Sequence, residues 1–199
     1  MRPRLALHTL PLLAPVSAHG YVESPPTRHP GPASLAACGA AVTEDITRDN
    51  TSHVEGLPEL AAADPGYSGP GACNLWLCRG LQFDDNREGS QAWRAGQEVN
   101  FRVRLTIPHD GSANVSVVRA ADDAVLGEPL VVWPEGYANE TLYYARELPL
   151  NNTDFNVTLP DVSAECGVPG ACVLQWWWYA KTAKQTYESC VDFTMAATA

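Results

Sequence analysis

The sequence predicts an all-β protein, an antiparallel β-sandwich with long loops that is stapled by disulfides. Three observations support this prediction. Several short segments alternate apolar and polar residues, the 199-residue chain holds 16 Pro and 15 Gly, and it contains six Cys. Hydrophobic residues make up 45% of the chain, which is enough to build a buried core.

The clearest predicted strand covers residues 97–107, where apolar and polar side chains alternate without interruption. A turn at residues 108–111 then leads into a second strand at residues 113–119. Residues 19–36 are expected to be extended with little regular structure, and residues 37–75 to form a long loop region. The remaining predicted strands are residues 141–146, 155–159, 172–180 and 187–195. This succession of short strands is typical of an immunoglobulin-like or fibronectin-like sandwich.

The first 18 residues have the pattern of a secretory signal peptide. Two arginines precede an apolar stretch, and small residues stand where a signal peptidase would cut after Ala18. The alternative is a membrane anchor, but the apolar run is shorter than the roughly 20 residues that span a bilayer. We therefore expect a secreted, extracellular protein with one domain over residues 19–199. No hydrophobic tail follows Met195, so we expect no lipid anchor.

Cysteines and glycosylation sequons agree with secretion. The even number of cysteines suggests three disulfides in an oxidising compartment, although the sequence leaves the pairing open. Two pairs are close enough in sequence for local bridges, Cys73–Cys78 and Cys166–Cys172. The cysteines are Cys38, Cys73, Cys78, Cys166, Cys172 and Cys190, and the sequons begin at Asn50, Asn114, Asn139, Asn151 and Asn156.

The charge balance excludes two classes of partner. The formal net charge is −10 at pH 7, and the predicted cleavage would make it more negative by removing two arginines. Binding to nucleic acid or to anionic lipid requires basic surface, so neither partner is expected.

Cleavage after Ala18 would expose the α-amino group of His19. An N-terminal histidine can bind one metal ion twice, through its amine and through its ring, and a nitrogen donor set of this kind suits copper. The plain alternative is that processing happens to cut there. A third nitrogen would come from His29, His53 or His109. We favour His109 because it lies in the turn that ends a strand, and sandwiches build their sites in such turns. The alternative is that His109 is an ordinary turn residue with no role in metal binding.

These residues resemble a known enzyme family over almost the whole mature chain. The start HGYVESPPTR, the segment PHDGSANVSVV at residues 108–118 and the ending CVLQWWWYA…QTYESCVDF are similar to lytic polysaccharide monooxygenases. The segment CNLWLCRGLQF at residues 73–83 makes the chain most similar to auxiliary activity family 16, a group from fungi and oomycetes.

The resemblance implies roles for individual residues. His19 and His109 match the histidine brace that holds one copper ion per chain, Tyr187 matches the aromatic residue on the axial side of the copper, and Gln185 matches a glutamine that positions bound oxygen. A related fungal family also has a histidine upstream of this glutamine, but residues 172–186 contain none. Tyr21 is a candidate for stacking on a sugar, with packing against neighbouring prolines as its alternative role.

The implied activity is oxidative cleavage of cellulose or a related β-glucan by a copper enzyme. The reaction would use peroxide or oxygen with a small-molecule or enzymatic electron donor, and C1 oxidation is favoured over C4. We expect a monomer. One alternative is a copper-binding or copper-delivery protein of the same fold without turnover, and another is a carbohydrate-binding module without metal. Trp176 and Trp178, on one face of the strand 172–180, are expected to pack in the core.

Overall fold

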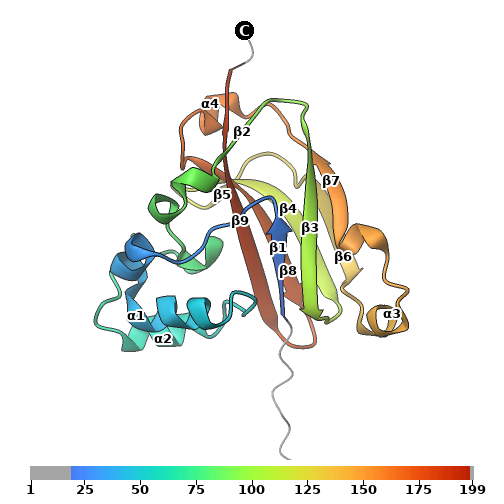
Figure 1. Ribbon diagram of the computed structural model, residues 1–199, viewed down its shortest axis with the longest axis horizontal. Helices are drawn as coiled ribbons and strands as arrows, with labels where there is room; N and C mark the ends of the chain where they lie inside the picture. The colour runs from blue at the N-terminus through green and yellow to red at the C-terminus, as the bar shows by residue number, and fades with distance from the viewer. Residues whose placement is uncertain (1–18, 198–199) are drawn as a thin grey trace, which may run out of the picture.

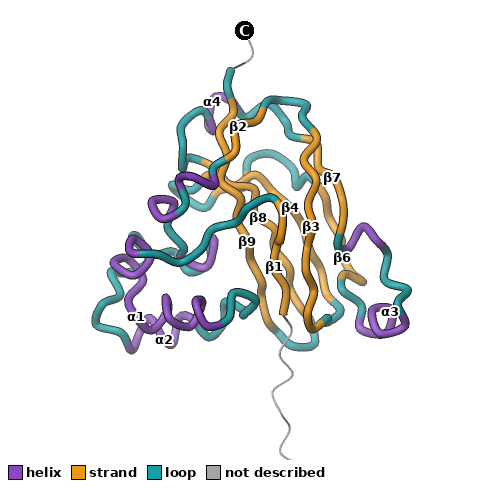
Figure 2. The backbone as a smooth tube through the Cα atoms, viewed as in Figure 1, coloured by secondary structure: helices purple, strands orange, loops and turns teal. Residues whose placement is uncertain are grey.

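The computed structural model describes residues 19–197, so the predicted signal peptide lies outside the described residues. Two β-sheets pack face to face, with helices along their flanks (Figure 1; Figure 2). The smaller sheet has the strand order β1-β3-β7, and the larger has the order β2-β9-β8-β4-β5, with β6 also paired to β4. None of the described helices is long and apolar enough to cross a membrane. The predicted sandwich is confirmed.

Five strands, β3, β4, β7, β8 and β9, begin and end within two residues of the predicted bounds. The strands β1, β2, β5 and β6 were not predicted. The smaller sheet consists of β1 (His19–Ser24), β3 (Glu98–Ile107) and β7 (Asp154–Thr158). The larger consists of β2 (Gln91–Trp93), β4 (Gly111–Arg119), β5 (Ala124–Val125), β6 (Val131–Tyr137), β8 (Cys172–Ala180) and β9 (Gln185–Met195). Within residues 19–197, every pair of strands is antiparallel except β2 with β9, which is parallel.

The main core lies between the sheets and is rich in large aromatic side chains. Trp176 and Trp178 are fully buried there, as predicted. The rings of Tyr137 and Trp178 meet edge to face at 5.9 Å, and those of Phe101 and Phe155 stack at 5.6 Å. Pairs of this kind add about 0.5–1.5 kcal/mol beyond the area that they bury.

Two predictions about residues 19–75 are wrong. Residues 19–36 are not without regular structure, because they hold β1 and the start of α1, and residues 37–75 are not a long loop. They hold most of α1 (Pro32–Arg48) and all of α2 (Leu57–Ala63). Three features of α1 favour a helix: a proline at its N-terminus, many alanines, and the helical spacing of the buried residues Cys38, Val42 and Ile46.

The strand predicted at residues 141–146 is also wrong. This segment forms α3 (Glu140–Ala145). Its Thr and Tyr residues have strand propensity, but the side chain of Asn139 accepts a hydrogen bond from the backbone N–H of Leu142 and caps the helix. The cap therefore outweighs the intrinsic preference of the residues that follow it. The remaining short helix is α4 (Ser163–Cys166), and four 3₁₀ turns are η1 (Cys78–Gly80), η2 (Phe83–Asp85), η3 (Arg87–Gly89) and η4 (Leu150–Asn152).

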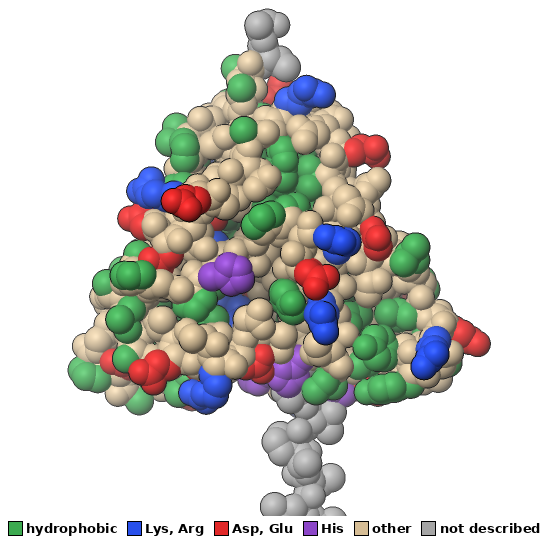
Figure 3. Space-filling view, in the orientation of Figure 1, with side chains coloured by type: hydrophobic (Ala, Val, Ile, Leu, Met, Phe, Trp, Pro, Cys, Tyr) green, Lys and Arg blue, Asp and Glu red, His purple; other side chains and the backbone are tan. Residues whose placement is uncertain are grey.

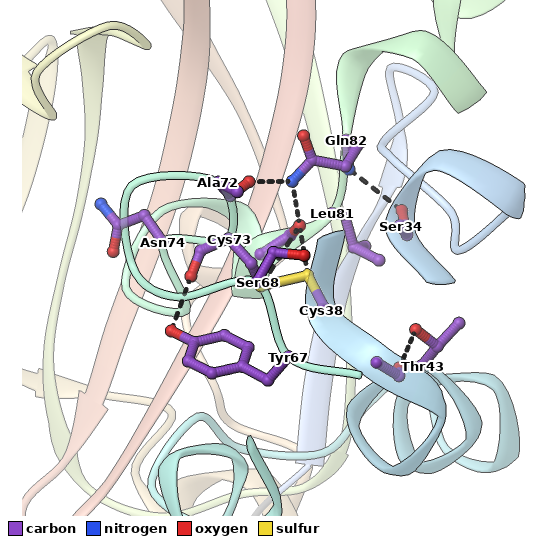
Figure 4. Close-up of a disulfide and its surroundings, with 12 residues drawn as sticks. Ser34, Cys38, Thr43, Tyr67, Ser68, Ala72, Cys73, Asn74, Leu81 and Gln82 are labelled. Atoms are coloured by element: carbon purple, nitrogen blue, oxygen red, sulfur yellow. Dashed lines mark hydrogen bonds between the residues drawn. A yellow bond between two sulfur atoms is a disulfide. The ribbon is translucent and has the colours of Figure 1, made fainter. Parts of the chain in front are cut away.

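Three disulfides staple the helical flank and the loops to the sandwich. Cys38 pairs with Cys73 and joins α1 to the loop before η1 (Figure 4), and Cys78 pairs with Cys190 in β9. The expected Cys166–Cys172 bridge is present, but Cys73 and Cys78 are not paired with each other. Cys73 and Cys78 each form a bridge to a distant part of the chain instead.

Removing the Cys78–Cys190 bridge should destabilise the fold more than removing Cys166–Cys172. The two bridges span 112 and 6 residues, and the chain-entropy relation gives about 5 and about 2 kcal/mol for loops of these lengths. Guanidinium denaturation of the two paired Cys→Ser variants measures the difference. Equal losses of unfolding free energy would contradict the assigned role of the long-range bridge.

Candidate metal centre

The pairing of β1 with β3 brings the two predicted brace histidines to one edge of the sandwich. His19 lies opposite Ile107 in the antiparallel register, and His109 follows two residues later in the β3–β4 turn. The hydroxyl of Thr106 donates to the carbonyl of His19 at 3.2 Å. Histidine side chains gather at this edge in the space-filling view, close to where the described chain begins (Figure 3).

A carboxylate holds the ring of His19 by one nitrogen. Nε2 of His19 lies 3.0 Å from Oδ2 of Asp49, directly after α1. Burial raises the pKa of Asp49, but the hydrogen bonds from Thr51 and the charges of His19 and Arg79 outweigh burial and leave the pKa below its ordinary value. With Nε2 held by Asp49, the ring nitrogen that can chelate a metal together with the main-chain nitrogen of His19 is Nδ1.

A second carboxylate contacts the ring of His109. Nδ1 of His109 meets Oε1 of Glu140, at the start of α3. The side chain is buried, and its Nε2 has no hydrogen-bond partner among residues 19–197. Desolvation lowers the pKa of His109, which favours the neutral imidazole that a metal binds. In a metal-binding histidine, one ring nitrogen typically contacts a carboxylate while the other binds the metal. The Nδ1 contact with Glu140 and the buried, unpartnered Nε2 of His109 fit this arrangement.

The turn that carries His109 is fastened to the end of β6 and to the N-cap of α3. The two carboxylate oxygens of Asp110 accept hydrogen bonds from the backbone of Gly136 at 3.1 Å and from Nδ2 of Asn139 at 3.0 Å. Gly111 closes the turn because a Cβ there would lie 1.9 Å from the carbonyl oxygen of Tyr179. Glycine is therefore required at the point where β4 begins.

Tyr187 lies in the sandwich core, but its strand is not beside the strand that leads to His109. The strand β9 pairs with β8 and β2 in the larger sheet, whereas β3 belongs to the smaller sheet. The Tyr187 ring is fully buried and stacks on Trp178 at 4.6 Å, and its hydroxyl donates to Oε1 of Gln185 at 2.8 Å. The side chains of Tyr187 and Gln185 are therefore held in fixed positions relative to each other.

The structure places His53 beside His19, although the sequence analysis favoured His109 over His53 as the third nitrogen donor. His53, His19 and Asp49 line one surface hollow of about 450 Å³. The His53 ring meets Tyr187 edge on, with centroids 6.3 Å apart, and its Nδ1 lies 3.4 Å from Oε2 of Glu55. A histidine thus stands beside Tyr187, although residues 172–186 contain none. No local pattern signals this, because tertiary packing of the α1–α2 loop brings it there.

A buried arginine fixes the loop that carries Asp49 and His53. The Arg79 guanidinium donates to the carbonyl oxygen of Asn50 at 2.7 Å and to the hydroxyl of Ser52 at 2.6 Å. Burial lowers the pKa of Arg79 to about 10, so the group stays charged at neutral pH. Its backbone N–H donates to the buried Glu188 in β9 at 3.2 Å. The loop is therefore tied to the sheet that carries Tyr187.

Two other candidates, His29 and Tyr21, line a different cavity from the one lined by His19 and His53. His29 is exposed, and its backbone N–H donates to Asn86. Tyr21 is half-buried in β1 and lines a small cavity together with Arg28 and Pro30. Residues 19–197 contain no cluster of three His, Cys, Asp or Glu side chains that could hold a metal. A site here needs a main-chain nitrogen besides the two imidazoles.

Comparison with known proteins gives one family match. Residues 19–193 match the family described as lytic polysaccharide mono-oxygenase, cellulose-degrading. No curated protein matches the sequence. The expected membership of auxiliary activity family 16 is not supported, because the matching family corresponds to the AA10 group instead.

Several solved structures show distant similarity to this chain. A chitin binding domain from Burkholderia pseudomallei is 12% identical, with 90% of this chain and 100% of that chain covered and a TM-score of 0.43. An AA10 lytic polysaccharide monooxygenase from Streptomyces lividans is 17% identical, with 88% and 99% covered and a TM-score of 0.41. A cellulose-active LPMO in complex with copper is 15% identical, with 88% and 98% covered and a TM-score of 0.44.

Glu188→Gln should stabilise the protein increasingly as the pH rises. Burial raises the pKa of Glu188 well above 4.5, so the folded state keeps a proton that the unfolded chain has already released. The parent therefore loses stability as the pH rises above 4.5, by up to about 1.4 kcal/mol per pH unit, until the folded pKa is passed. Glutamine removes this dependence and can still accept from Arg79.

Urea denaturation of the parent and of Glu188→Gln at pH 4 and pH 7.5 measures this effect. The stability advantage of the variant should be larger at pH 7.5. An advantage that shrinks towards pH 7.5 would mean that the ionised Glu188 is the form that the fold favours.

Proposed function

Because the chain belongs to the family of cellulose-degrading lytic polysaccharide mono-oxygenases, we propose that it is a secreted enzyme that cleaves cellulose or a related β-glucan oxidatively. The family makes it a copper-dependent oxidoreductase that acts on polysaccharide. The observation that carries the residue assignment is the pair of carboxylate-held histidines at one edge of the sandwich, His19 with Asp49 and His109 with Glu140.

The proposed copper ligands are the amine and Nδ1 of His19 and Nε2 of His109. The amine becomes available only when the chain is cut after Ala18, because the same nitrogen is otherwise part of a peptide bond. Three nitrogen donors suit copper and leave coordination positions for small molecules. Bound copper would supply one-electron chemistry with a reductant and with oxygen or hydrogen peroxide.

The residues around the ligands have distinct proposed tasks. Asp49 and Glu140 fix the ring orientations of the two histidines, which keeps the metal-facing nitrogens from rotating away. Tyr187, whose buried ring contacts that of His53, would shield one side of the centre. Its hydroxyl donates to Gln185, so it would not serve as a strong ligand. Gln185 is the proposed group that orients a small oxygen species, and Tyr21 is a proposed contact for a sugar.

One alternative is a copper-binding or copper-delivery protein that uses the same ligands without turnover. Both functions require the two histidines and the free amine, so copper binding by itself does not separate them. Oxidised sugar products do, because only the enzyme makes them.

A chain that begins at His19, loaded with copper and given a reductant and hydrogen peroxide, should release oxidised oligosaccharides from cellulose. We expect C1-oxidised products to predominate, as measured by mass spectrometry and ion chromatography. His109→Ala removes a proposed ligand, so it should reduce product release by at least about 100-fold, the largest loss typical of changing a residue that only supports a ligand. His29→Ala, on an exposed segment, is the matched control and should retain activity.

The same chain with Ala18 retained is a second control and should release no oxidised product. If copper-loaded protein that begins at His19 oxidises neither cellulose nor related β-glucans, this result would favour the copper-delivery alternative. Equal activity of the chain that retains Ala18 would remove the amine from the proposed ligands.

A further inference from the structure

The outer face of the larger sheet carries a pair of stacked aromatic rings that the proposed metal centre does not use. Trp177 and Tyr179 project from β8 with centroids 6.2 Å apart and ring planes 20° apart. Both side chains are partly exposed, whereas their neighbours Trp176 and Trp178 are fully buried on the opposite face. Two adjacent, nearly parallel rings at a surface form an apolar platform.

A glycosylation sequon lies directly beside this platform. Asn114 of β4 is the cross-strand partner of Trp177, and it begins the sequence Asn-Val-Ser. On its other side, Asn114 is paired with Val132 of β6, whose side chain is 52% exposed. An asparagine thus stands in the middle of an exposed apolar strip, where a large covering group would remove apolar surface from water.

The asparagine side chain is set up to carry a group on its nitrogen. The hydroxyl of Ser116 donates to Oδ1 of Asn114 at 3.0 Å, and Nδ2 has no hydrogen-bond partner within residues 19–197. Asn139 offers the contrast, because its Nδ2 donates to Asp110 and its Oδ1 caps α3. Among these two sequons, Asn114 is therefore the one whose amide nitrogen can be substituted without losing a bond.

We propose that Asn114 carries an N-linked glycan whose first sugar packs on the Trp177–Tyr179 platform. The attachment links the Nδ2 of Asn114 to the sugar with loss of the lipid-pyrophosphate carrier that donates it, which is the reaction of the secretory pathway. The apolar face of the sugar then covers the two rings, and the sugar hydroxyls face water. The inference needs secretion but does not depend on copper or on any reaction at the metal centre.

The test uses metal-free protein secreted by a host that adds N-linked glycans. Peptide mapping should find Asn114 occupied. Asn114→Gln should lower the melting temperature by roughly 2–4 °C when Trp177 is present, the size expected for losing one aromatic contact in a chain of this length. In a Trp177→Thr background the same change should lower it by about 1 °C or less, because the platform is already lost.

Three further proteins keep the result interpretable. Ser116→Ala removes the same sequon through another residue and should reproduce the effect of Asn114→Gln. Trp177→Leu replaces Trp177→Thr if the threonine variant does not fold. Asn156→Gln removes a sequon whose cross-strand neighbour is Asn100, so its effect should be equal with and without Trp177.

Two results would overturn the proposal. An unoccupied Asn114 in the secreted protein would do so, and so would equal melting shifts with and without Trp177. Protein with an unoccupied Asn114 can also be passed over immobilised cello-oligosaccharides. If it is retained there, and if Trp177→Thr abolishes this retention, the platform binds a free polysaccharide instead. Because these measurements use metal-free protein, a failure here is separate from a failure of the proposed enzyme activity.

Discussion

The antiparallel pairing of β1 with β3 is the constraint on which the metal centre depends. The register places His19 opposite Ile107, and the chain then needs only two more residues to reach His109. Because β1 starts at His19, the first residue of the strand supplies both a ring and, after cleavage, an amine at the same edge. Hydrophobic packing of the β1-β3-β7 sheet on the larger sheet keeps this register in place.

Two carboxylates flank that edge, and each fixes the direction of one imidazole. Asp49 and Glu140 come from opposite flanks of the sandwich, from the end of α1 and the start of α3 (Figure 1). Arg79 in turn holds the loop after Asp49, and the Cys78–Cys190 bridge ties its neighbour to β9. The helices that distinguish this chain from a bare sandwich therefore serve to orient its two histidines.

Alternation was sufficient to predict the sandwich, and the chemistry of nitrogen donors was sufficient to nominate His19 and His109. Tyr187 and Gln185 were implied only by the family resemblance. The strand at residues 97–107 and the burial of Trp176 and Trp178 followed from period-two patterns. The helix α1 was missed although its alanines and helical spacing were visible, and α3 was missed because the cap at Asn139 outweighed strand propensity. Asp49 and Glu140 could not be found from sequence, and His53 was considered but not favoured, since only tertiary packing brings these side chains to the edge.

Copper binding by two forms of the chain tests the central claim most directly. Calorimetry and electron paramagnetic resonance should show one Cu(II) bound through three nitrogens when the chain begins at His19. They should show much weaker binding and an altered spectrum when Ala18 is retained or when His109 is replaced by Ala, whereas His29→Ala should match the parent. Tight binding with an unchanged spectrum in the chain that retains Ala18, or in His109→Ala, would contradict the proposed site.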